Sequence, residues 1–336
     1  MHARSLTIPR LQAGGLNLGY RCSSHCRHCL YACGPHRRDG LPDSPDALHS
    51  LLDELKSRAP LASFHIGGGE PFLDVDLLSS VLEGLSDRGL LFDYVETNAS
   101  WVLSESHARA TLERLRALGL NGLLVSASHF HAEFTKPRKT LALIAVARQI
   151  LAGGVIVWLP DFVPDLASFD QDSRLDLDAL IAERGDGFAL QVGMRYGVIP
   201  GGRGGRLLAA HGFCMDWSDA ASGAPCRQRL VSTTHFHVDL AGNYVPGLCG
   251  GIVVPLSLVP GEIPMDRFPL LDRIYNQGLE SLVTWAMDEH GFTPLDSGYS
   301  GACDLCTHVR IHLHDRGSFE ELGPPGFYDE KSISGY

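Results

Sequence analysis

A group of cysteines near the N-terminus has the spacing of a metal-binding loop. Cys22, Cys26 and Cys29 follow the pattern Cys-x3-Cys-x2-Cys, directly after the first predicted strand. Three thiolates on one short loop can bind three irons of a cubane iron–sulfur cluster, which leaves the fourth iron open to a small molecule. A structural zinc ion would instead take four protein ligands, which Cys33 and one of the two loop histidines could complete. The spacing alone leaves both interpretations open.

A glycine-rich turn follows one strand–helix unit later, where residues 67–71 read Gly-Gly-Gly-Glu-Pro. Glycine lets the backbone approach a ligand closely, and the carboxylate of Glu70 can pair with an ammonium group. Together the two segments resemble the signature of the radical S-adenosylmethionine (SAM) superfamily. The resemblance implies that Gly68, Gly69 and Glu70 receive the amino group of SAM. It also implies that His28, directly before the third cysteine, lies near the adenine.

The resemblance extends more weakly over residues 15–200. Asn98 follows the third predicted strand, Ser126 ends the fourth, and Arg195 follows the sixth. The first two would contact SAM, and Arg195 would contact SAM or an anionic substrate group. The family implies a partial (β/α)6 TIM-type barrel and reductive cleavage of SAM to a 5′-deoxyadenosyl radical that removes hydrogen from a substrate. An electron donor of the flavodoxin or ferredoxin type would be its partner.

A second group of cysteines lies in the C-terminal part of the chain. Cys303 and Cys306 form a Cys-x2-Cys pair, Cys249 follows a predicted hairpin, and Cys226 and Cys214 precede it. This arrangement resembles the auxiliary-cluster segment of SPASM or twitch domains. It implies a second [4Fe–4S] cluster, for which we choose Cys226 over Cys214 as the fourth ligand. A zinc ion completed by a histidine of residues 308–314, or a buried group of free thiols, is the alternative.

Two pairs of histidines could also line a cavity. His129 and His131 follow the fourth predicted strand, where barrel-type α/β enzymes place catalytic groups, and we predict that they move protons. His235 and His237 alternate just before the hairpin. That pattern is typical of a half-exposed strand.

The apolar pattern predicts strands at residues 16–20, 63–66, 92–96, 122–126, 155–159 and 188–192. It predicts helices at residues 46–57, 76–87, 104–118, 140–152 and 176–183. Repeated strand–helix units imply a parallel sheet. A glycine-rich break at residues 200–206 separates a predicted barrel domain (residues 1–205) from an auxiliary-cluster domain with a tail (residues 206–336). We expect a helix near residues 269–290 and a loosely held stretch at residues 317–336.

The net charge of −11 argues against nucleic acid and anionic membranes as partners. Without a signal peptide or a membrane-length apolar run, nine cysteines are typical of a cytoplasmic metal-binding protein. We expect a radical SAM oxidoreductase or transferase that crosslinks or dehydrogenates a ribosomal peptide. The alternatives are action on a small metabolite in cofactor or natural-product biosynthesis, and a non-catalytic iron–sulfur or zinc metalloprotein.

Overall fold

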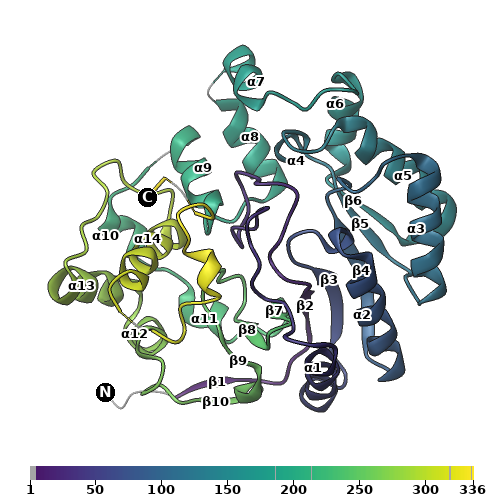
Figure 1. The fold of residues 1–336 in the computed structure, drawn as a ribbon. Coiled ribbons are helices and arrows are strands. Elements are labelled where there is room, and N and C mark those ends of the chain that lie inside the picture. Colours follow the sequence, from purple (N-terminus) through teal and green to yellow (C-terminus); the bar gives the residue numbers. More distant parts are fainter. Residues whose placement is uncertain (1–4, 186, 213, 318, 334) are drawn as a thin grey trace.

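The fold is built on one eight-stranded sheet, seen in a computed structural model that describes residues 5–185, 187–212, 214–317, 319–333 and 335–336. Its strand order is β6-β5-β4-β3-β2-β7-β8-β9, parallel from β6 to β7 and antiparallel from there on (Figure 1). The strands are β2 (Ala13–Asn17), β3 (Ser63–Gly67), β4 (Leu91–Thr97), β5 (Leu123–Ser126), β6 (Val155–Trp158), β7 (Phe236–Asp239), β8 (Asn243–Val245) and β9 (Val254–Pro255). Parallel pairing brings the carboxyl ends of β2 to β7 to one edge.

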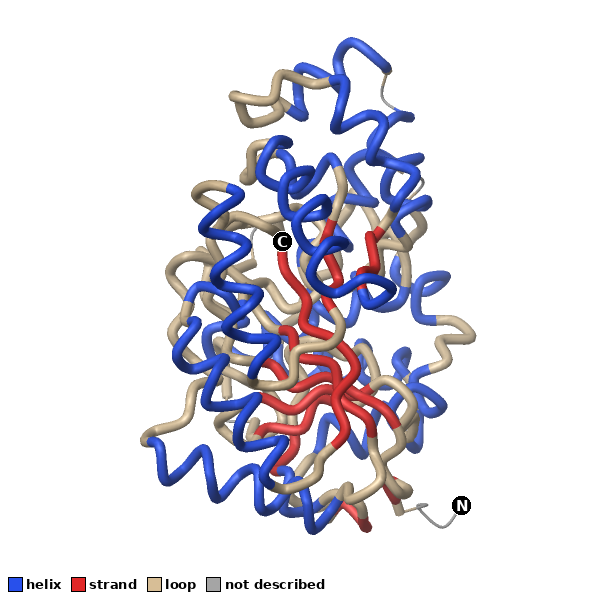
Figure 2. The backbone as a smooth tube through the Cα atoms, turned by 90° about the vertical axis from the view of Figure 1, so that its right-hand side faces the viewer, coloured by secondary structure: helices blue, strands red, loops and turns tan. Residues whose placement is uncertain are grey.

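Helices lie outside this curved sheet, as Figure 2 shows. The helices predicted from the apolar pattern are confirmed as α1 (Pro45–Arg58), α2 (Val75–Asp87), α3 (Glu105–Ala117), α5 (Pro137–Leu151) and α7 (Leu177–Arg184). Four of them begin at a capping side chain: Ser44, Asp74, Ser104 and Asp176 each accept a hydrogen bond from a backbone N–H three residues on. Such caps satisfy N–H groups that a helix leaves unpaired at its start.

The predicted strand at residues 188–192 is wrong, because this segment lies in helix α8 (Gly187–Tyr196). Its buried residues Ala189, Val192 and Gly193 recur at helical spacing, not at alternate positions. The sixth parallel strand is β7, which pairs with the opposite edge of β2. A strand from beyond residue 230 therefore completes the parallel part of the sheet.

The glycine-rich segment at residues 200–206 is also more ordered than predicted, because α9 (Arg203–His211) begins inside it. A Cβ atom on Gly205 would lie 2.4 Å from Oδ1 of Asp304 in α14 (Ala302–His314). The absence of a side chain at Gly205 thus allows the two helices to pack closely.

The sheet and one hydrophobic core run across the predicted boundary at residue 205. Phe64 of β3 packs against Phe236 of β7, and the same core reaches Leu313 in α14. The predicted helix at residues 269–290 is divided by Gly278, whose φ is +89°. The remaining C-terminal helices are α10 (Trp217–Ala221), α11 (Cys226–Leu230), α12 (Pro269–Gln277) and α13 (Leu279–His290).

The C-terminal stretch is not loosely held, contrary to the prediction. The Tyr336 hydroxyl donates hydrogen bonds to Asp304 (2.8 Å) and to the carbonyl of Gly202 (3.2 Å). Buried Ser332 bonds to His36, beside the cysteine loop. The tail therefore closes over the N-terminal loop.

The shorter elements are β1 (Leu6–Ile8), β10 (Gly261–Ile263), α4 (His129–Ala132), α6 (Val163–Ser168) and the 3-10 turns η1 (Pro71–Leu73), η2 (Ala152–Gly154), η3 (Pro160–Phe162), η4 (Leu256–Leu258) and η5 (Pro325–Phe327). β1 and β10 form a separate antiparallel pair. Among the described helices, none is both long enough and apolar enough to cross a bilayer.

Candidate functional site

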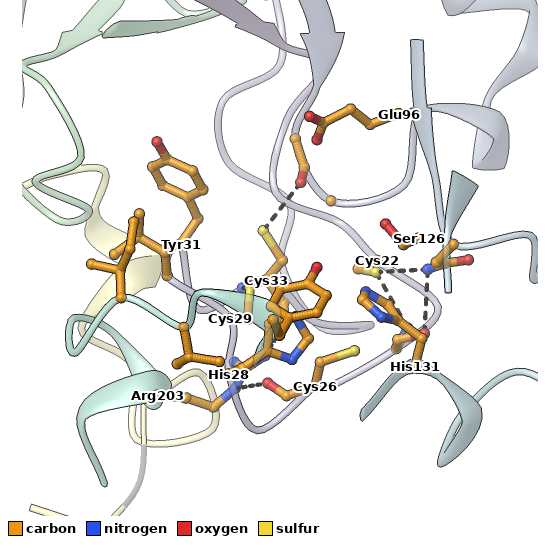
Figure 3. A pocket seen from close by; sticks show the side chains of 18 of the residues that line it. Cys22, Cys26, His28, Cys29, Tyr31, Cys33, Glu96, Ser126, His131 and Arg203 are labelled. Carbon is orange, nitrogen blue, oxygen red and sulfur yellow. Dashed lines mark hydrogen bonds between the residues drawn. The ribbon is translucent and has the colours of Figure 1, made fainter. Parts of the chain in front are cut away.

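A cavity of about 310 Å³ lies at the carboxyl ends of the parallel strands. Cys22, Cys26 and Cys29 all line it, as Figure 3 shows, and Cys33 lies beside them. The other predicted site residues that line this cavity are His28, Gly68, Gly69, Asn98, Ser126 and His131. The fold thus gathers residues from five separate segments around one space.

The cysteine loop is held in place by Arg203, a buried residue of α9. Its guanidinium donates hydrogen bonds to the carbonyls of Cys26 (2.9 Å), Cys33 (2.8 Å) and Ser332 (2.7 Å). One side chain therefore ties both ends of the loop to the C-terminal tail. Sequence analysis assigned no site role to Arg203, because its partners are backbone atoms of residues far away in the chain.

The thiols of the loop differ in their acidity. Burial and the nearby Glu70 carboxylate raise the pKa of Cys22 to about 12, and burial also raises the pKa of Cys26. A hydrogen bond with the Cys33 thiol lowers the pKa of Cys29 well below its ordinary value. Bound metal would favour the thiolate at all three ligands.

In this structure the described cysteines do not form a compact three-ligand set around one point. Ligand atoms around a tetrahedral zinc lie about 3.3–3.8 Å apart, given bonds of about 2.0–2.3 Å. Within the described part of the chain, no cysteine belongs to a set of three ligand atoms that lie within 4.8 Å of one another. The fit to an iron–sulfur cluster comes from the ligand chemistry, because three thiolates on one loop can each bind one iron of a cubane and leave the fourth iron open.

The glycine-rich turn packs directly on the cysteine loop. A Cβ atom on Gly69 would lie 1.9 Å from the carbonyl oxygen of Arg21, and Gly68 has a φ of +122°. The N–H groups of Gly69 and Glu70 donate to the carbonyls of Gly19 and Arg21, each at 3.0 Å. These glycines are therefore required for contact between the two segments as well as for the shape of the cavity.

Glu70 lies beneath the cavity wall and is not among the lining residues that the structure describes. Its carboxylate accepts hydrogen bonds from the backbone N–H groups of Asn98 (2.7 Å) and Phe72 (3.1 Å), and from the Thr97 hydroxyl (3.0 Å). Burial raises its pKa to about 7. In this arrangement Glu70 fixes the backbone at the end of β4.

Asn98 extends this network to the cysteines. Its side-chain amide donates to Sγ of Cys22 at 3.4 Å and to the hydroxyl of Ser24 at 3.2 Å. Hydrogen bonds to cluster sulfurs are one way in which proteins set a cluster's reduction potential.

One wall of the cavity is aromatic. The ring of His28 contacts the rings of His131 (4.9 Å between centroids) and Tyr196 (4.6 Å). Burial lowers the pKa of His131 to about 4, and its Nδ1 shares a hydrogen bond with Ser128 (2.8 Å). Neutral rings arranged in this way suit a flat, apolar ligand group.

Besides Glu70, two predicted residues lie outside the cavity lining. His129 is buried against Phe162 and Phe188, and its Nε2 bonds to Asp165 at 3.0 Å. Arg195 points outward from α8, with its side chain 64% exposed and paired with Asp161. Arg195 lies outside the cavity because residues 187–196 form helix α8, which places Tyr196 toward the cavity and Arg195 away from it.

The cavity residues that sequence analysis did not predict include His65, Glu96 and Tyr31. It also took His237 for a half-exposed residue, whereas His237 is buried and lines the cavity. His65 and His237 lie in β3 and β7, whose residues are buried almost throughout. β3 and β7 flank β2 on opposite sides. The pairing of β2 with β7 joins distant parts of the chain, and the local sequence pattern does not encode it.

The C-terminal cysteines form a second group of neighbouring thiols. Cys226, Cys249, Cys303 and Cys306 line one small pocket, with Arg229 and Arg310 at its edge. The Arg229 guanidinium donates to Sγ of Cys303 at 3.0 Å. Burial, together with the neighbouring thiols, raises the pKa of Cys226 and of Cys249 to about 12.

Other candidate ligands lie elsewhere. Cys214 donates to the carbonyl of Ala209 at 3.3 Å and is not among the described residues around this pocket. His308 bonds to Tyr299 (2.8 Å), and His312 bonds to the carbonyl of His290 (2.8 Å). Leu30 and Leu248 line both the pocket and the large cavity, so a thin wall separates the two cysteine groups.

Comparison with known proteins gives a match for the N-terminal part. Residues 16–148 match the family model described as the Radical SAM superfamily. Comparison with curated proteins found no match.

Solved structures give weaker likenesses. One is BtrN in complex with AdoMet and 2-DOIA, at 16% identity and a TM-score of 0.33; the match covers 45% of this chain and 57% of BtrN. A second is anSMEcpe with bound AdoMet, at 13% identity and a TM-score of 0.40, covering 70% and 73%. A third is coproporphyrinogen III oxidase (HemN) from Escherichia coli, a radical SAM enzyme by its title, at 14% identity and a TM-score of 0.33, covering 90% of each chain. All three TM-scores are below 0.5, so the link to the superfamily rests on the family match and on the geometry of the site.

Proposed function

We propose that this protein is a radical SAM enzyme that cleaves SAM reductively and abstracts hydrogen from a substrate in the cavity, a proposal that the family match over residues 16–148 supports. Cys22, Cys26 and Cys29 would hold the [4Fe–4S] cluster that the family implies. The observation that supports this most strongly is the shared cavity, where these thiols face the glycine turn and the strand ends. When bound, the cluster supplies one electron to the sulfonium of SAM, which breaks the C5′–S bond and yields the 5′-deoxyadenosyl radical.

The protein's own residues position the reactants. His28, His131 and Tyr196 would provide the flat wall for adenine. Gly68 and Gly69 would present backbone oxygens to the ammonium group of SAM, whose charge is complementary to the buried Glu70 carboxylate behind them. The cavity walls would exclude water from the radical.

We further propose that Cys226, Cys249, Cys303 and Cys306 hold an auxiliary [4Fe–4S] cluster in a SPASM- or twitch-like segment. Four cysteines line the pocket, so every iron of a cubane could have a protein ligand, and such a cluster would transfer electrons. The arginines at the pocket edge would offset its negative charge. Its thin shared wall with the cavity favours net oxidation of the substrate.

The proposed substrate is a peptide that is crosslinked or dehydrogenated, and a small metabolite is the alternative. A flavodoxin or ferredoxin would deliver the first electron. The partial (β/α)6 barrel of the family agrees with the parallel strands β2 to β6, although β7 takes the place of the expected sixth strand.

The test is anaerobic reconstitution with iron and sulfide, followed by dithionite and SAM. Wild-type protein should release 5′-deoxyadenosine and methionine, and Cys26→Ala should release neither. Cys214→Ala, which alters a cysteine that is not among the described residues lining the cavity or the small pocket, is the matched control and should behave like wild type. Absence of 5′-deoxyadenosine from the wild-type reaction would indicate a non-catalytic metalloprotein.

Iron content tests the auxiliary site separately. Wild-type protein should bind about eight irons per chain, and Cys303→Ser/Cys306→Ser should bind about four while it still cleaves SAM. About four irons in the wild-type protein would contradict the auxiliary cluster.

A further inference from the structure

Two histidines meet across the strand that precedes the cysteine loop. Gly15 of β2 is paired in register with His65 of β3 on one side and with His237 of β7 on the other. A Cβ atom on Gly15 would lie 2.3 Å from His237 and 2.6 Å from Nε2 of His65. Because Gly15 has no side chain, the two imidazoles have room to contact each other.

The geometry of this pair is that of two ligands of one metal ion. The Nε2 atoms of His65 and His237 lie 3.2 Å apart. Ligand nitrogens of a tetrahedral zinc ion are separated by about 3.3–3.4 Å, given zinc–nitrogen bonds of about 2.0–2.1 Å. The pair therefore needs little movement to coordinate a cation.

A third histidine completes the set. His235 lies two residues before His237, directly before β7, and a ring nitrogen of each histidine lies within 4.8 Å of those of the other two. His235 is exposed, and its ring centroid lies 5.6 Å from that of His65 and 5.2 Å from that of His237. Among the described residues, these three histidines form the one set of three candidate ligands whose ligand atoms all lie within 4.8 Å of one another.

The remaining nitrogen of His237 is held as metal ligands usually are. Its Nδ1 shares a 2.7 Å hydrogen bond with the hydroxyl of Tyr31, which comes from the cysteine loop. Partners of this kind fix the tautomer and the orientation of a ligating imidazole. An Oε1 atom of Glu96 lies 3.9 Å from Nε2 of His65 and adds an acidic group next to the set.

We propose that His65, His235 and His237 bind one divalent cation of the zinc type on the wall of the SAM cavity. All three residues line that cavity. Three imidazoles leave a fourth coordination position for water or for an oxygen or nitrogen atom of a substrate. Metal binding itself does not depend on the proposed radical chemistry, whereas a role in anchoring the substrate rests on it.

The experiment uses tag-free protein whose iron–sulfur clusters have been reconstituted, so that the cysteines are occupied. Zn²⁺ is added, excess is removed, and bound zinc is measured by mass spectrometry and X-ray absorption at the zinc edge. We expect one zinc per chain, with a first shell of nitrogen and oxygen at about 2.0–2.1 Å. The absence of bound zinc, or a sulfur shell at about 2.3 Å, would overturn the proposal.

Variants locate the site. His235→Ala changes an exposed side chain, so it should fold normally and weaken zinc binding at least tenfold. Tyr31→Phe should weaken it about 10- to 100-fold, because it removes the hydrogen bond to His237. His49→Ala, an exposed histidine of α1, is the control and should bind zinc like wild type. Undiminished zinc affinity in His235→Ala would overturn the proposal.

The outcome is separable from that of the proposed function. Failure to bind zinc would leave 5′-deoxyadenosine formation intact. Failure to cleave SAM would leave the zinc measurement intact in protein whose iron content shows that the cysteines are occupied. Each proposal can therefore fail on its own.

Discussion

Replacing Arg203 with methionine should destabilise the cysteine loop and reduce its iron content. The guanidinium makes three hydrogen bonds of 2.7–2.9 Å to carbonyls of Cys26, Cys33 and Ser332. Hydrogen bonds to a charged group contribute about 1.5–3 kcal/mol each, so the plain sum is about 5–9 kcal/mol. Such contributions are not additive, and methionine keeps part of the apolar contact, so we expect a loss of about 3–5 kcal/mol.

The assay combines anaerobic urea unfolding with iron analysis of the reconstituted protein. Arg203→Met should lower the free energy of unfolding by the stated amount and lose most of the iron bound by the N-terminal loop. Arg203→Lys keeps the charge but not the planar fork of donors, so it should fall between wild type and Arg203→Met.

Arg195→Met is the matched control, because it removes the same side chain from an exposed ion pair with Asp161. Surface ion pairs contribute about 0–1 kcal/mol, so both stability and iron content should stay near the wild-type values. If Arg203→Met were as stable as Arg195→Met and kept its iron, the proposed role of Arg203 in holding the loop would be refuted.

Three further substitutions test the surroundings of the loop. Gly69→Ala places a methyl group against a backbone carbonyl and should abolish cluster assembly, whereas Gly153→Ala, which meets nothing within 4 Å, should not; iron analysis decides. The raised pKa of Glu70 means that the folded protein holds a proton that the unfolded chain has lost, so stability should fall by about 3 kcal/mol as the pH rises from about 4.5 to about 7. Urea unfolding across this range should show that slope in wild type and a shallower one in Glu70→Gln; identical slopes would contradict the assignment. Asn98 donates an N–H hydrogen bond to Sγ of Cys22, and this bond stabilises the reduced, more negative cluster. Asn98→Ala removes the bond, so the reduction potential should fall by about 20–60 mV in a redox titration followed by electron paramagnetic resonance. An unchanged potential would exclude this effect.

Local sequence was sufficient where the signal is a short spacing or a period. The helices at residues 46–57 and 104–118 were predicted from apolar residues at helical spacing, and their buried leucines and capping serines agree with that pattern. The same reasoning failed at residues 188–192, where a short apolar run fits a strand and a helix equally well.

The site shows the same division. The three-cysteine loop and the glycine turn could be recognised from residue type and spacing, because each is only a few residues long. The role of Arg203 in holding the loop, the outward position of Arg195 and the contact of His65 with His237 across Gly15 could be seen only in the folded protein. Those relations join residues far apart in the chain through strand pairing and helix packing, and no local pattern encodes which distant segment will lie alongside.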